Sequence, residues 1–115
     1  SHSLGGVNPR LHHGTLNAMF LPAVIRFNAT CASVQAERRL ERMAHAMGLS
    51  SAGDVAPAIQ DMNARLGLPT GLAAMGVTPE VFDDVIKGAL ADHCHKTNPR
   101  IATPEEYREM LAQSL

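Results

Sequence analysis

A chain of 115 residues has the size of one domain, and it is long enough to bury an apolar core without stabilisation by disulfides or metal ions. Its formal net charge is −1 and it has no basic stripe, which argues against a nucleic-acid partner, and no apolar run is long enough to span a membrane. With 45% hydrophobic but only 3% aromatic residues, the composition favours helices over strands.

The first long apolar segment covers residues 14–28, and its pattern predicts a helix that is apolar on most sides. A helix of this kind is buried at the centre of a domain. Pro22 lies inside it and is expected to kink the helix or to leave one backbone carbonyl without its partner. The next helix is predicted over residues 34–47, where apolar side chains recur at helical spacing and Gly48 follows as the helix-ending residue.

Three further helices are predicted in the second half of the chain. One covers residues 54–66, with Asp54 as its N-cap and Gly67 just past its end. Thr78-Pro79-Glu80 begins the next, and Thr103-Pro104-Glu105-Glu106 begins the last with a capping box. No alternating strand of convincing length is present. The pattern therefore predicts an all-α bundle of about five helices that forms one domain over residues 1–115.

The methionines bear on whether the domain has an exposed binding surface. Four of the six lie on the same helical stripes as Leu and Ile residues: Met43, Met47, Met62 and Met110. Methionine adapts to varied partners, so a Met-rich surface would suit an interaction module. The shared stripes favour core packing instead.

Histidines are the most numerous candidate ligands. They are His2, His12, His13, His45, His93 and His95. Neutral imidazole is the commonest protein ligand for transition metals, although a single histidine is more often a polar loop residue. Successive residues of a helix diverge by about 100°, so His12 and His13 are not expected to face the same metal and are predicted to have separate roles.

The two cysteines, Cys31 and Cys94, form neither a CxxC pair nor a disulfide framework. They are predicted to be free thiols in a reducing cytoplasm. His93 and His95 flank Cys94 and, together with Cys31, could suggest a zinc site. Structural zinc sites use four closely specified ligands, which makes this the disfavoured interpretation.

Three motifs together resemble those of one enzyme family. They are His2-Ser3-Leu4-Gly5, which fits an H-x-L-G motif, His13-Gly14-Thr15-Leu16-Asn17-Ala18, which fits H-G-x-x-N-A, and Thr97-Asn98-Pro99-Arg100, which fits a T-N-P-R turn. On these residues the chain resembles the C-terminal, metal-bearing domain of the iron-containing (group III) alcohol dehydrogenases. The specific match covers residues 2–28 and 92–107, and the middle agrees as a helical run of suitable length.

The resemblance implies roles for two histidines. In this family one Asp and three His bind a divalent metal, and a further His lies beside the substrate and the nicotinamide. His13 would be the last metal ligand, and His2 would be the non-ligating catalytic residue. Counting ten residues from His2 selects His12 instead, whereas aligning Gly14 and Asn17 selects His13. We favour His13 because loop lengths vary more readily than the contacts that start a buried helix.

The T-N-P-R turn is implied to have a positioning role between the last two helices. Asn98 precedes Pro99 and is therefore expected to be extended or in a turn. Arg100 is expected to tie loop carbonyls or a carboxylate together.

The implied activity is reversible hydride transfer between an alcohol and an aldehyde or ketone, with NAD or NADP as coenzyme and Fe(II) or another divalent metal such as Zn(II) as Lewis acid. Gly5-Gly6 is too short for a phosphate-binding loop and follows no strand, so no residue of this chain is predicted to bind the coenzyme. That role would belong to an N-terminal nucleotide-binding domain. The chain, which starts at Ser1, is expected to be a fragment that is inactive alone.

The expected partners are that missing domain and a small alcohol or aldehyde, with a homo-oligomer left open. The alternative hypothesis is a stand-alone helical interaction or metal-binding module without dehydrogenase activity.

Overall fold

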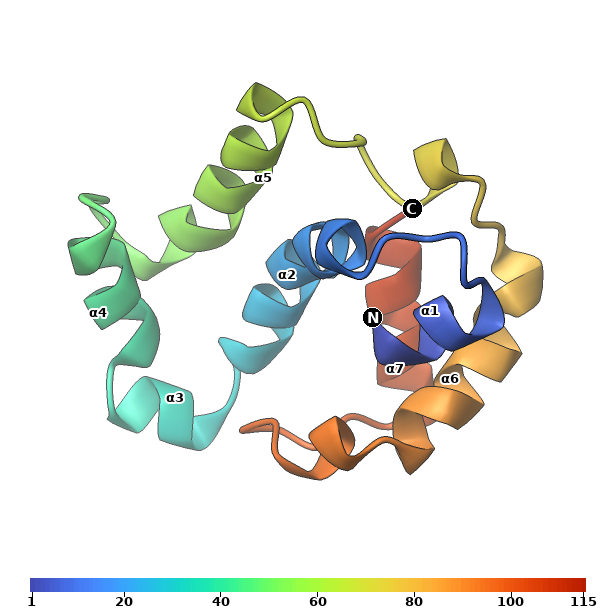
Figure 1. Ribbon diagram of the computed structural model, residues 1–115. Coiled ribbons are helices and arrows are strands. Elements are labelled where there is room, and N and C mark those ends of the chain that lie inside the picture. Colours follow the sequence, from blue (N-terminus) through green and yellow to red (C-terminus); the bar gives the residue numbers. More distant parts are fainter.

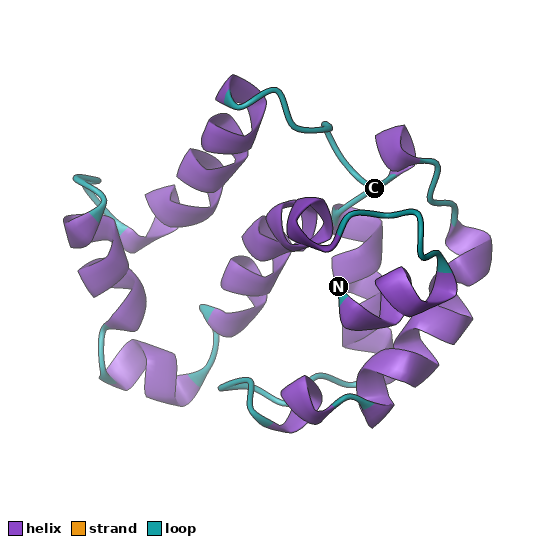
Figure 2. Cartoon of the chain, viewed as in Figure 1, coloured by secondary structure: helices purple, strands orange, loops and turns teal.

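The computed structural model describes residues 1–115 and contains helices and loops but no strands (Figures 1 and 2). The α-helices are α1 (His2–Val7), α2 (His13–Asn28), α3 (Ala32–Ala36), α4 (Arg39–Ala46), α5 (Val55–Arg65), α6 (Phe82–Ala91) and α7 (Pro104–Gln113). Four short 3-10 helices join them: η1 (Ala52–Asp54), η2 (Ala73–Met75), η3 (Pro79–Val81) and η4 (His93–Lys96). The predicted all-α fold is confirmed, with seven α-helices instead of about five.

Helix α2 runs through the middle of a flattened molecule of 38 × 32 × 19 Å. On one side of it lie α3, α4 and α5, and on the other lie α1, α6 and α7 (Figure 1). Leu16, Met19, Ala23 and Ile25 of α2 are all buried and belong to three different apolar clusters. The apolar pattern of residues 14–28 thus produces the expected central helix.

Pro22 does not end α2, and it leaves the carbonyl of Ala18 without the N–H that would normally reach it from four residues on. The side-chain amide of Asn63, on α5, donates to that carbonyl at 2.9 Å. The predicted orphan carbonyl is therefore present. It serves as an anchor point between α2 and α5.

The prediction of one helix over residues 34–47 was wrong, because the chain breaks at Arg38, which has φ +50°. Val34 and Leu40 are both buried in one apolar cluster. In a straight helix, six residues of about 100° each would point these two side chains about 120° apart. The break between α3 and α4 turns both toward the cluster. Gly48, with φ +72°, follows α4 as predicted.

The start of the α5 segment contains a 3-10 turn, η1, that was not predicted. Asp54 is the N-cap of α5, as predicted, but its side chain makes no capping bond to α5 and instead accepts from the N–H of Ser51, the N-cap of η1, at 3.0 Å. The predicted capping box of α7 is confirmed, since Thr103 Oγ1 accepts from the Glu106 N–H and Glu106 accepts from the Thr103 N–H. The sequence pattern located the starts of both helices but not the 3-10 turn before α5.

Helix α1 was not among the predicted helices. It is a short helix whose Leu4 is only 1% exposed, and it lies against α6. Ser3 donates to the Val85 carbonyl at 2.6 Å. A Cβ at Gly88 would collide with Ser3, so the glycine on α6 permits this close approach.

The predicted burial of the methionines was largely wrong. Met43, Met47 and Met62 are 42%, 38% and 41% exposed, whereas Met110 is buried as expected. Leu66, which lies four residues after Met62, is 68% exposed. The stripe of α5 is buried only near its start, where Val55 and Ile59 meet α4 and α2.

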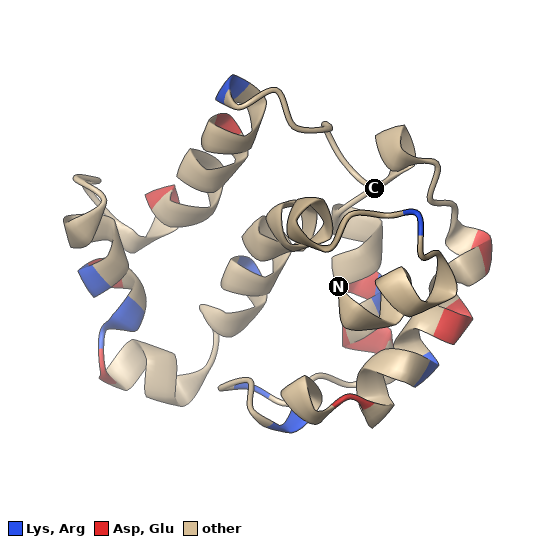
Figure 3. Cartoon of the chain, in the orientation of Figure 1, with Lys and Arg blue, Asp and Glu red and all other residues tan.

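No helix of the structure combines the length and apolar character that crossing a membrane requires. Lys and Arg residues are spread over several elements, with Asp and Glu residues among them (Figure 3). Cys31 and Cys94 are free, as predicted.

Candidate functional site

The site begins where α1 and the first turn of α2 meet. The rings of His2 and His13 are stacked there, with their centroids 5.0 Å apart and their planes 12° from parallel. The chain between them reverses direction through residues 8–12, where the Asn8 side chain accepts from the Arg10 N–H at 3.2 Å. The structure therefore brings together the two residues that the sequence singled out.

His12 and His13 have different environments. His12 is the N-cap of α2, and its Nδ1 accepts from the Thr15 N–H at 3.4 Å. His13 lies against His2, and its Nε2 is 3.1 Å from the amide of Asn17, one turn further along α2. The Asn17 amide nitrogen can only donate, so Nε2 of His13 presents a lone pair, the form in which an imidazole nitrogen can bind a metal.

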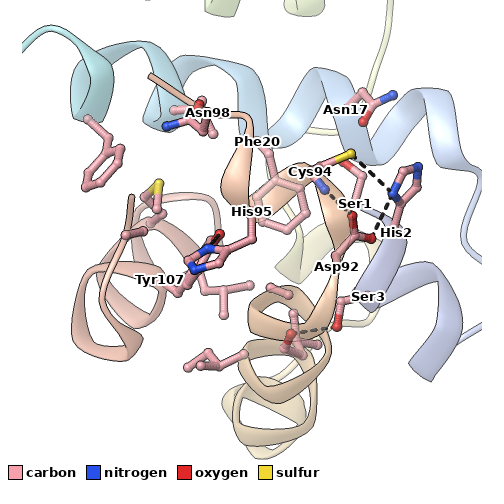
Figure 4. A pocket seen from close by; sticks show the side chains of 18 of the residues that line it. Ser1, His2, Ser3, Asn17, Phe20, Asp92, Cys94, His95, Asn98 and Tyr107 are labelled. Atoms are coloured by element: carbon pink, nitrogen blue, oxygen red, sulfur yellow. Dashed lines mark hydrogen bonds and ion pairs between the residues drawn. The ribbon is translucent and has the colours of Figure 1, made fainter. Parts of the chain in front are cut away.

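The other wall of the site is Asp92, which ends α6 and caps η4. One carboxylate oxygen accepts from the Cys94 N–H at 2.8 Å, and the other is 3.0 Å from His2 Nδ1 (Figure 4). The Cys94 backbone N–H, assisted by the Cys94 thiol and His2, lowers the pKa of Asp92 from 3.8 to about 2. Asp92 is therefore ionised at neutral pH and positions the imidazole of His2.

Cys94 and His95 extend this wall in different directions. The Cys94 thiol is 4.0 Å from His2 Nδ1 and 3.5 Å from His93 Nε2. Its hydrogen bond with Asp92, and then burial, raise the pKa of the thiol. His95 bonds to the Tyr107 hydroxyl at 2.8 Å, and burial, followed by the charge of Asp92, raises the pKa of Tyr107.

These polar groups stand at one end of a cavity of about 470 Å³ between α2, α6 and α7 (Figure 4). Most of its lining is apolar, from side chains that include Phe20, Val24, Ile86, Ala89 and Met110. An apolar cavity with a few convergent polar groups is the usual form of a small-molecule site.

The T-N-P-R segment secures the far end of this cavity. Asn98 and Asn28 exchange hydrogen bonds of 2.8 and 3.1 Å. Arg100 donates to the Phe27 carbonyl, pairs with the Glu106 carboxylate and lies 4.1 Å from the centre of the Phe27 ring. The expected tie to a carbonyl and a carboxylate is present, and it fastens the segment before α7 to the end of α2.

Sequence reasoning missed Asp92 as a site residue. The only feature of the local sequence that marks Asp92 is its position after an apolar helix and before a short polar run, which is typical of a helix cap. Its approach to His2 depends on the packing of α1 against α6, which no local pattern contains. The disfavoured zinc set around Cys31 is not assembled, since Cys31 contacts Ser33 and the Pro99 carbonyl.

The profile of the Fe-containing alcohol dehydrogenase family, C-terminal region, matches residues 1–115. The chain belongs to this family. It is 55% identical over 119 residues to the 4-hydroxybutyrate dehydrogenase of Cupriavidus necator, with 100% of this chain and 31% of the relative covered. It is 33% identical over 126 residues to the NAD-dependent methanol dehydrogenase of Bacillus methanolicus, again covering 100% of this chain and 31% of the relative.

A third relative, the 1-propanol dehydrogenase PduQ of Salmonella typhimurium, is 35% identical over 127 residues, covering 100% of this chain and 34% of the relative. The chain thus spans about a third of the length of the curated relatives that it matches.

Proposed function

We propose that this chain is the helical, metal-binding part of an NAD- or NADP-linked alcohol dehydrogenase that transfers hydride reversibly between a small alcohol and its aldehyde or ketone. The observation that carries the proposal is the stacking of His13 on His2, which lines the polar end of an apolar cavity, in a chain of this family.

His13 suits one position of a divalent metal site. Its side chain is exposed, and Nε2 presents a lone pair to the Asn17 amide that a metal could take in place of that hydrogen bond. A single histidine does not complete a site, so we propose that the remaining ligands come from residues that precede those of this chain in the intact enzyme. When bound, Fe(II) or a substitute such as Zn(II) supplies Lewis-acid chemistry that lowers the pKa of the alcohol.

His2 is proposed to handle the proton of the substrate hydroxyl. Asp92 binds its Nδ1, which fixes the ring and leaves Nε2 to accept a proton from the alcohol or return one to the aldehyde. Asp92 stays ionised throughout this cycle because its pKa is about 2. Asp92 is therefore a positioning residue that acts through His2.

The apolar cavity is proposed to hold the carbon chain of the substrate and to keep water away from the reacting carbon. The names of the three relatives all refer to primary alcohols, namely 4-hydroxybutyrate, methanol and 1-propanol. We propose a small primary alcohol as the substrate of this protein too.

The coenzyme is proposed to bind to a separate N-terminal nucleotide-binding domain. In this chain Gly5 and Gly6 lie inside α1, which leaves no glycine-rich loop of the kind that cradles phosphates. We therefore expect no dehydrogenase activity from these 115 residues alone. The two free thiols fit a reducing cytoplasm.

The test is to join this chain to the part of the Cupriavidus necator relative that precedes the matched region. The chimera should reduce NAD or NADP when a primary alcohol is added, should lose this activity on chelation, and should regain it with Fe(II) or Zn(II). The 115-residue chain alone should show no alcohol-dependent reduction of NAD or NADP under the same conditions. A folded, coenzyme-binding chimera without activity, or an active isolated chain, would contradict the proposal.

A further inference from the structure

His2, Asp92 and Cys94 form the one group of three metal-ligating side chains in the structure, and their ligand atoms all lie within 4.8 Å of one another. His2 comes from the start of α1, whereas Asp92 and Cys94 come from the junction between α6 and η4. Figure 4 shows the three side chains pointing toward a common point. His13 is not part of this group, although its ring is stacked on that of His2.

The spacing of the three atoms fits a tetrahedral ion. Zinc bonds of roughly 2.0 Å to nitrogen or oxygen and 2.3 Å to sulfur place neighbouring ligand atoms roughly 3.3–3.6 Å apart. His2 Nδ1 is 3.0 Å from the Asp92 oxygen and 4.0 Å from Cys94 Sγ. Small side-chain rotations would therefore bring each atom to its coordination distance without moving the backbone.

A fourth candidate ligand is adjacent. His93 Nε2 is 3.5 Å from Cys94 Sγ, its Nδ1 is 3.4 Å from an Asp92 oxygen, and its side chain is 84% exposed. Its ring is also stacked on that of His2, with a centroid distance of 6.1 Å. Water could fill this position equally well.

The charges also favour a divalent cation. Without one, the Asp92 carboxylate opposes ionisation of Cys94, whose thiol keeps its proton. A dication would displace that proton into solvent and form the metal–sulfur bond. The set would then combine one carboxylate, one thiolate and neutral imidazole, which balances a charge of +2. A thiolate with imidazole selects Zn(II) or a similar borderline metal over Mg(II) or Ca(II).

We propose that His2, Asp92 and Cys94 form a zinc-binding site that is separate from the dehydrogenase metal position assigned to His13. A metal at this site would replace the hydrogen bond between His2 Nδ1 and Asp92 and would leave His2 Nε2 protonated, so zinc binding here and the proton transfer proposed for His2 would exclude each other. The proposal does not depend on the dehydrogenase function, because its test uses neither alcohol nor coenzyme.

The test titrates the metal-free 115-residue chain with Co(II), which replaces Zn(II) and gives a thiolate-to-cobalt charge-transfer absorption when sulfur is a ligand. The wild-type chain should show this band with one equivalent of Co(II) bound, and Zn(II) should displace it. Cys94→Ser should abolish the band and weaken Zn(II) affinity by more than about tenfold. Replacing a residue that only hydrogen-bonds to a metal ligand already lowers metal affinity by about tenfold or more, and loss of a ligand should lower it further. His2→Ala and Asp92→Asn should weaken affinity similarly while retaining the helical circular dichroism.

Cys31→Ser is the matched control, because it removes the other thiol and should leave the band and the affinity unchanged. The proposal would be overturned by the absence of the band in the wild-type chain, by its persistence in Cys94→Ser, or by its loss in Cys31→Ser. The dehydrogenase metal set implied for this family contains no sulfur, so failure of one proposal is not mistaken for failure of the other.

Discussion

The two sides of α2 are built in different ways. On one side, α3, α4 and α5 follow α2 directly in the chain and pack around Ile25, Val34 and Ile59. On the other, α1 lies against α6, so that His2 meets Asp92 across 90 residues. The first side depends on local sequence, whereas the second assembles a site from distant segments. The comparison shows why helices were easier to predict than the site.

The largest expected effect comes from the core on the site side. Leu16→Ala removes a side chain that is 0% exposed and should lower the free energy of unfolding by about 3 kcal/mol. Met62→Ala, on the opposite side, removes a side chain that is 41% exposed and should change it by less than about 0.5 kcal/mol. Urea denaturation of both variants measures this difference. Equal losses would mean that Met62 is a core residue after all.

The attachment of α5 to the central helix α2 includes the hydrogen bond from Asn63 to the Ala18 carbonyl. Asn63→Ala should lower the free energy of unfolding by about 2 kcal/mol, because the Ala18 carbonyl loses its donor. Pro22→Ala supplies a backbone N–H for the same carbonyl, so the loss caused by Asn63→Ala should be smaller in that background. A double-mutant cycle in urea tests this coupling. Additive effects would show that Asn63 does not compensate for Pro22.

Loss of a helix cap should cost a similar free energy of unfolding on both sides of α2, because each cap bonds only to residues within three positions along the chain. Ser51→Ala removes the cap before α5 and Thr103→Ala removes the cap of α7. Each should cost about 1 kcal/mol by thermal or chemical denaturation. A much larger loss for Thr103→Ala would indicate that its capping box also supports Arg100, which pairs with Glu106.

The smallest expected effect is a pH dependence on the site side. Because the pKa of Asp92 falls from 3.8 to about 2 on folding, its ionised form stabilises the fold above about pH 4. This contribution disappears as the pH falls toward 2. Asp92→Asn should therefore flatten the acid end of the stability curve. An unchanged curve would show that its hydrogen bonds to Cys94 and His2 contribute nothing.

Much of the fold was predictable because caps and apolar spacing act within a few residues. Thr103, Gly48 and Pro22 each have the structural consequence expected of them. The break at Arg38 was not predictable from local sequence. It allows α3 and α4 both to pack on an apolar cluster that also contains residues of α2 and α5. The exposure of Met62 likewise depends on where α5 leaves the core.

The site was predictable only where a motif named its residues. His2 and His13 were identified from the family pattern, and the structure places them in contact. Asp92 and its link to His2 required the tertiary arrangement, because the two residues share no local pattern and meet only through the close packing of Ser3 against Gly88.

The most direct test of the account compares His13→Ala with His12→Ala in the chimeric dehydrogenase described above. The account predicts that His13→Ala lowers bound metal and alcohol-dependent coenzyme reduction by more than about a hundredfold, because it removes a metal ligand. His12→Ala should keep both within about threefold and lose only a helix cap. Retention of metal and activity in His13→Ala, with their loss in His12→Ala, would contradict the account.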